Sequence, residues 1–150
     1  MELYHVYNRG NHKGNICFDN KDLNVLKKMF FNSLSSLCGK KSSVVSLCIM
    51  PNHYHLLVDV AKKEFLSMAM RDIGREYTAY MNRKYGLVGR LFQGPYNKKL
   101  VGDFIYFRTL VQYMRDNPKE VRYYKHLTTL VENKQLIEYY DFLLSTINLP

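Results

Sequence analysis

Alternating apolar and polar positions predict several β-strands. From Leu3 to Asn8, successive residues belong to opposite faces, and Arg9-Gly10-Asn11 then forms a turn. Val44–Ile49 is an apolar run rich in β-branched residues, and Pro51 separates it from a second run at His53–Val60. Two such runs joined by a short turn indicate a β-hairpin. A shorter strand is expected near Tyr96–Val101.

Apolar residues at intervals of three and four predict helices between and after these strands. Asp and Asn provide helix caps, whereas Gly and Pro provide stops. The expected bounds are Asp19 or Asn20 to Gly39, Phe65–Lys84, Asp103 to Pro118, and Leu136–Leu144. The expected buried stripes are Leu23, Leu26, Phe30 and Leu34 in the first helix, and Leu66, Ala69, Ile73, Tyr77 and Tyr80 in the second.

The predicted order of elements is β-α-β-β-α-β-α. This order resembles the split βαβ, or ferredoxin-like, arrangement of the α+β class, in which helices are packed on one face of an antiparallel sheet. Residues 1–150 show no internal repeat and no linker, so a single domain is expected.

The formal net charge of +9 favours a polyanionic partner, most simply a nucleic acid. Basic residues in the predicted turn, second helix and following segments are candidate DNA contacts: Arg9, Arg71, Arg75, Arg83, Arg90, Lys98 and Lys99. Cys17, Cys38 and Cys48 match no zinc-binding spacing, which favours reduced thiols. No apolar run approaches the roughly 20 residues of a membrane span, so a cytoplasmic protein is expected.

The stretch "IMPNHYHLLV" places two histidines inside an apolar strand. Alternation puts His53 and His55 on one face, where two imidazoles can bind one divalent ion if a third ligand comes from elsewhere. The alternative is a pair of hydrogen-bonded histidines on a solvated face. A metallohydrolase of the HxHxDH type would need Asp where Leu57 stands, and a zinc peptidase would need an HExxH helix.

The segment "LVQYMRDNP" supplies a candidate third ligand. Tyr113 and Asn117 are four residues apart, hence one turn apart on one helix face. Asn117 offers a carbonyl oxygen to a divalent ion, and Tyr113 offers a phenol that can attack phosphorus. A core tyrosine and a helix C-cap are the alternative interpretations of these two residues.

Four segments together resemble a known family. "YHVYNRGNHKGNIC", "MPNHYHLLV", "YGLVGRLFQGPY" and "LVQYMRDNP" are similar, in this order, to the IS200-like single-tyrosine (Y1) transposases of the HUH superfamily, close to the REP-associated branch. The resemblance extends over residues 3–120, and residues 121–150 form a divergent extension. Pro95 stands where the family usually has a basic residue.

The resemblance implies a ferredoxin-like fold and a DNA transposase that uses Mg²⁺ or Mn²⁺. It implies cleavage and rejoining of single-stranded or hairpin DNA, with His53, His55 and Asn117 as metal ligands. Tyr113 would be the nucleophile that forms a 5′-phosphotyrosine. It also implies a possible homodimer. The alternatives are a non-catalytic or domesticated nucleic-acid-binding module on the same fold, and a metallohydrolase without a covalent step.

Overall fold

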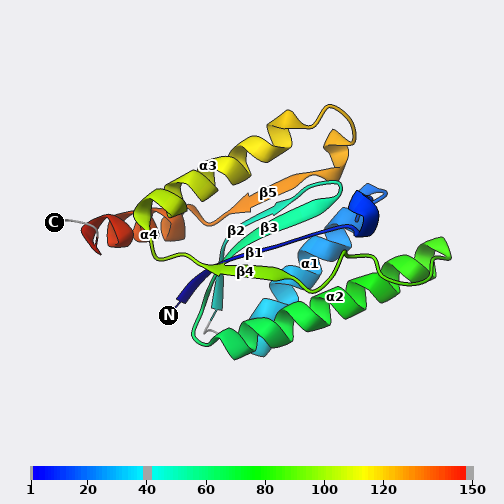
Figure 1. Cartoon of the computed structure of the whole chain (residues 1–150), viewed down its shortest axis with the longest axis horizontal. Coiled ribbons are helices and arrows are strands. Elements are labelled where there is room, and N and C mark those ends of the chain that lie inside the picture. Colours follow the sequence, from blue (N-terminus) through cyan, green and yellow to red (C-terminus); the bar gives the residue numbers. More distant parts are fainter. Residues whose placement is uncertain (1, 39–41, 148–150) are drawn as a thin grey trace.

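The computed structural model describes residues 2–38 and 42–147, in an α+β arrangement of five strands and four α-helices (Figure 1). The elements are β1 (Glu2–Arg9), α1 (Asn20–Cys38), β2 (Ser42–Ile49), β3 (His53–Val60), α2 (Lys63–Tyr85), β4 (Asn97–Leu100), α3 (Phe104–Glu120), β5 (Thr129–Glu132) and α4 (Lys134–Ile147). The predicted stop at Gly39 lies outside the described residues. Within the described ranges, no helix is both long and apolar enough to cross a bilayer.

All strands pair antiparallel in the order β4-β1-β3-β2-β5. The first four strands follow the split βαβ order, so the predicted fold class is confirmed. β3 lies at the centre, and its register against β1 places Tyr7 opposite His55 and Arg9 opposite His53. The register of β2 shifts between Val44 and Ser46, where the ladder with β3 is irregular.

The helices α1 and α2 cover one face of the sheet, as expected. Their predicted stripes are buried against alternate residues of β1, β2 and β3, including Val6, Leu47 and Leu56. Tyr80 differs from the rest of its stripe, because it is only partly buried and its hydroxyl bonds to Asp22.

The other face is covered by α3 and α4, which corrects the expectation that helices pack on one face only (Figure 1). Phe107, Leu110 and Met114 of α3 and Tyr140 of α4 pack against the alternate set of strand residues, such as Leu57. β5, which the sequence did not predict, pairs with β2 and joins these two helices. The sheet is therefore buried on both sides.

Pro118 lies within α3, although the sequence predicts that it ends the helix. A proline removes one N–H donor and disfavours helical backbone in the preceding residue. Here Asn117 is buried with the apolar face of the helix, and its side chain donates to the carbonyl of Tyr113 at 2.9 Å. Packing and this bond keep the chain helical to Glu120.

The buried carboxylate of Asp22 joins the beginning of α1 to the end of α2. Its oxygens accept from Lys84 Nζ at 2.8 Å and from the hydroxyls of Tyr80 and Tyr85 at 2.9 and 2.6 Å. They also accept from the backbone N–H of Phe18 at 3.0 Å. Burial alone would raise the pKa of Asp22, but these bonds, that of Lys84 first, lower it to about 2.

Replacing this carboxylate is expected to destabilise the fold. Asp22→Asn removes the charge that Lys84 and both tyrosines face, and should lower the free energy of unfolding by roughly 2–4 kcal/mol at pH 7. Urea unfolding followed by circular dichroism measures the change. Asp72→Asn is the matched control, because Asp72 pairs with the exposed Arg71 and Arg75, so a loss below about 1 kcal/mol is expected.

The same carboxylate predicts a loss of stability in acid. The pKa of Asp22 is lower in the folded chain than its ordinary value of 3.8, so its contribution is complete above pH 4. Between pH 4 and pH 2 the carboxylate takes up a proton, and about 2 kcal/mol should be lost. Urea unfolding should therefore show the wild type and Asp22→Asn converging toward pH 2. A difference that stays constant over this range would contradict the assignment.

Candidate active site

The His-Tyr-His stretch begins β3, and its two histidines share the sheet face that lies under α3. Tyr54 points to the opposite face, where it is buried in the core formed with α1 and α2. The rings of His53 and His55 stand nearly perpendicular, with 5.2 Å between their centroids. Strand alternation thus brings both imidazoles to one place.

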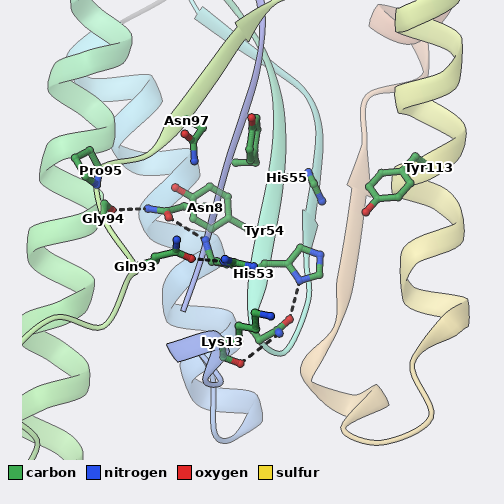
Figure 2. A pocket seen from close by; sticks show the side chains of 13 residues that line it. Asn8, Lys13, His53, Tyr54, His55, Gln93, Gly94, Pro95, Asn97 and Tyr113 are labelled. Atoms are coloured by element: carbon green, nitrogen blue, oxygen red, sulfur yellow. Dashed lines mark hydrogen bonds between the residues drawn. The ribbon is translucent and has the colours of Figure 1, made fainter. Parts of the chain in front are cut away.

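A pocket of about 680 Å³ opens beside these histidines. It is lined by Tyr7, Asn8, Arg9, Lys13, Asn52, His53, Tyr54, His55, Gln93, Gly94, Pro95, Asn97 and Tyr113. Figure 2 shows the imidazoles of His53 and His55 and the phenol of Tyr113 directed into the space between β3 and α3. The structure therefore brings together the histidine pair and the tyrosine that the sequence placed about sixty residues apart.

His53 is contacted at both ring nitrogens by amide oxygens. Its Nδ1 lies 2.7 Å from Oδ1 of Asn52, and its Nε2 lies 3.2 Å from Oδ1 of Asn117. The amide of Asn117 is oriented by its own Nδ2, which donates to the carbonyl of Tyr113. Burial lowers the pKa of His53, so the ring is neutral at pH 7 and carries one N–H. With that proton on Nδ1, the Nε2 lone pair and the Asn117 oxygen form two adjacent donors for a cation.

Tyr113 lies one turn before Asn117 on α3, as the spacing predicts. Its side chain is 49% exposed, and its ring stands edge-on to His55 with 5.2 Å between centroids. Among residues 2–38 and 42–147, its hydroxyl has no hydrogen-bond partner. The phenol is therefore free to meet a substrate that enters the pocket from solvent.

His55 is buried and contacts a third histidine. Its Nδ1 lies 3.0 Å from Nε2 of His5, whose Nδ1 lies 2.8 Å from the hydroxyl of Tyr106. Burial lowers the pKa of His5 to about 4 and that of His55 to about 3, so both rings are neutral at pH 7. The Nε2 atom of His55 is buried and lacks a hydrogen-bond partner in the described part of the chain.

These donors fit a divalent cation. No group of three or more His, Cys, Asp or Glu side chains that could hold a metal occurs within the described residues. The site nevertheless supplies a mixed set of nitrogen and oxygen ligand atoms, namely Nε2 of His53, Nε2 of His55 and Oδ1 of Asn117. A buried nitrogen without a partner is uncommon unless it serves a ligand. Three such donors leave positions open for water or substrate.

The candidate DNA-binding residues are divided between different surfaces. Arg9 lines the pocket, and so does Lys13, which the sequence analysis missed. The turn that carries both needs Gly10, because a Cβ there would lie 1.9 Å from the carbonyl oxygen of Gly14. The pocket thus has a cationic rim on the side of β1.

A neighbouring groove of about 560 Å³ runs along α2. Arg71, Arg75 and Arg90 line it, and Asn8, Tyr54, Gly94 and Pro95 are shared with the pocket. The remaining candidates line neither space: Arg83 is exposed near the end of α2, and Lys98 and Lys99 are exposed on β4.

The sequence did not indicate that His5, Tyr106 and Asn52 lie around the histidine pair. The alternation of the first strand already puts His5 and Tyr7 on one face. Their position beside His55 depends on the pairing of β1 with β3, which connects residues about fifty positions apart.

Comparison with known proteins gives the family. A family model described as IS200-like transposase matches residues 3–117. No curated protein matches the sequence. A solved REP-associated tyrosine transposase bound to a REP hairpin has a similar fold, with a TM-score of 0.56 and 14% identity over 79% of this chain and 67% of that chain. A protein described as a candidate transposase, from Deinococcus radiodurans R1, has a TM-score of 0.55 and 16% identity over 77% and 91% of the two chains.

Proposed function

This chain belongs to the IS200-like transposase family, and we propose that it cleaves and rejoins DNA strands with Tyr113 as the nucleophile. The observation that carries the proposal is the half-exposed phenol of Tyr113, which stands beside the histidine pair and has no hydrogen-bond partner within the described part of the chain. A tyrosine that only filled the core would be buried. A tyrosine that only covered the surface would not be expected to line the same pocket as His53 and His55.

The proposed reaction exchanges one phosphoester for another. The phenol oxygen of Tyr113 attacks the phosphorus of a DNA phosphodiester, and the bond from phosphorus to the 3′ oxygen breaks. The phenol gives up its proton, and the leaving 3′ oxygen takes one up. The products are a 5′-phosphotyrosine and a free 3′-OH. Rejoining reverses these steps when a 3′-OH attacks the phosphotyrosine, so the reaction needs no energy-rich cofactor.

His53, His55 and Asn117 would hold a Mg²⁺ or Mn²⁺ ion, which supplies Lewis-acid stabilisation of charge on the phosphate. The side-chain oxygen of Asn52 accepts a hydrogen bond from Nδ1 of His53, and this bond directs Nε2 of His53 toward the pocket. Asn117 is held by its bond to the carbonyl of Tyr113, so the ligand oxygen and the nucleophile move together on one turn of α3.

Single-stranded or hairpin DNA is the proposed substrate. Arg9 and Lys13 provide positive charge at the pocket, where a phosphate backbone would enter. From there the strand would follow the adjoining groove past Arg71, Arg75 and Arg90. The structural neighbour that is bound to a REP hairpin supports a DNA partner of this kind. A homodimer stays a prediction.

Tyr113→Phe is expected to abolish the covalent adduct while leaving the fold intact, because only an exposed hydroxyl is removed. The assay mixes the protein with Mn²⁺ and labelled single-stranded hairpin DNA from its own genomic flanks and separates the products by denaturing electrophoresis. The wild type should give a shifted band that protease removes. Tyr123→Phe, which changes another exposed tyrosine, should behave like the wild type.

An undiminished adduct with Tyr113→Phe would exclude this nucleophile. Binding of the same DNA by the wild type without any adduct would instead favour the non-catalytic module. Repeated turnover of nuclease substrates without a trapped adduct would favour the metallohydrolase.

His53→Ala is expected to separate cleavage from binding. Loss of a metal ligand should reduce cleavage at least about 100-fold, whereas DNA affinity should change less than about threefold. Arg9→Ala should show the opposite pattern, with weaker DNA binding and little change in the cleavage rate at saturating DNA. The salt dependence of its DNA affinity should fall by about one released counterion. Cleavage rates under saturating DNA and fluorescence anisotropy give the two quantities. Equal losses of both with His53→Ala would show that the histidine has a structural role.

A further inference from the structure

His5 lies between Tyr106 and His55 in a continuous chain of hydrogen bonds. It is 8% exposed, on the face of β1 that points toward α3. Its two ring nitrogens are both engaged, Nδ1 with the hydroxyl of Tyr106 at 2.8 Å and Nε2 with Nδ1 of His55 at 3.0 Å. The rings of His5 and His55 are nearly parallel, with 27° between their planes and 5.2 Å between centroids.

We propose that His5 and Tyr106 are positioning residues that hold His55 in the tautomer protonated at Nδ1, so that its Nε2 lone pair faces the pocket. The inference deepens the proposed function and rests on it, because it concerns the same metal-binding site.

Two neutral arrangements satisfy the contacts along this chain. In the first, Nδ1–H of His55 donates to Nε2 of His5, and Nδ1–H of His5 donates to the oxygen of Tyr106. In the second, every bond is reversed, so that the hydroxyl of Tyr106 donates to His5, His5 donates to His55, and His55 carries its proton on Nε2. The two arrangements differ in what His55 presents to the pocket.

The environment of His55 Nε2 favours the first arrangement. This atom is buried and has no hydrogen-bond partner among the described residues. A proton on it would be a buried N–H without an acceptor, which is costly. A bare lone pair at the same place is the form that binds a cation.

His53 shows the same design with a different partner. Its Nδ1 lies 2.7 Å from Oδ1 of Asn52 and its Nε2 lies 3.2 Å from Oδ1 of Asn117, and both oxygens can only accept. The shorter contact favours the proton on Nδ1, which leaves the Nε2 lone pair beside the Asn117 oxygen for a ligand. Metal-binding histidines commonly use their second nitrogen in this way, to fix tautomer and orientation. His5 would do for His55 what Asn52 does for His53.

The tautomers can be read in the metal-free protein by long-range ¹H–¹⁵N correlation spectra of a sample labelled at the histidine ring nitrogens. We expect protonated Nδ1 and unprotonated Nε2 for His55, and the same for His5. Protonated Nε2 on His55 would overturn the proposal. Because no metal is added, this result does not depend on whether the proposed reaction occurs.

Metal affinity provides the second test, with Mn²⁺ alone as the probe in calorimetry. His5→Phe keeps a ring but removes both nitrogens, and should weaken Mn²⁺ binding about 10- to 100-fold. Tyr106→Phe removes one oxygen and should give a smaller loss of Mn²⁺ affinity. In this variant a fraction of His55 should carry its proton on Nε2. Tyr139→Phe, an exposed tyrosine on α4 outside the pocket lining, should leave the affinity unchanged.

Thermal unfolding checks that each variant is folded. If His5→Phe does not fold, the ¹H–¹⁵N spectra of Tyr106→Phe show whether the tautomer of His55 depends on this chain of hydrogen bonds. Unchanged Mn²⁺ affinity and unchanged tautomers in a folded variant would overturn the proposal. Failure of the wild type to bind Mn²⁺ would instead contradict the metal site of the proposed function, while the tautomer of His55 still decides the role of His5.

Discussion

The antiparallel register of β1 against β3 is the constraint on which the site depends. It puts His5 and Tyr7 on the same face as His53 and His55, under α3. A shift of one residue would turn both imidazoles into the apolar core beneath α1 and α2. Because β3 is central and pairs along its length with β1 and β2, that shift would break two ladders at once.

The second requirement is the placement of α3, which the C-terminal segment secures. Arg115 bonds to Glu132 at the end of β5 at 2.8 Å, and Arg108 forms two bonds to Asp141 of α4 at 2.7 and 2.9 Å. The family match ends at residue 117, yet the segment that follows braces the helix that carries Tyr113. The extension therefore belongs to the architecture of the site.

Much of this arrangement follows from local patterns in the sequence. Strand alternation predicts that His53 and His55 share a face, and helical spacing predicts that Tyr113 lies one turn before Asn117; the structure agrees with both. β5 and the second helical layer were missed, because short strands and long-range packing leave weak local signals. The contact of His5 with His55 depends on strand pairing, which periodicity alone does not specify.

The buried carboxylate of Asp22 has a mechanical consequence for the pocket. It ties the end of α2 to α1. The loop after α2 leads into β4, and β4 pairs with β1. Between these points, Gln93 N–H donates to the Arg9 carbonyl at 2.9 Å, and Asn8 Nδ2 donates to the Gly94 carbonyl at 3.0 Å. The wall of the pocket at Gln93 and Gly94 is therefore tied both to β1 and, through α2, to the beginning of α1.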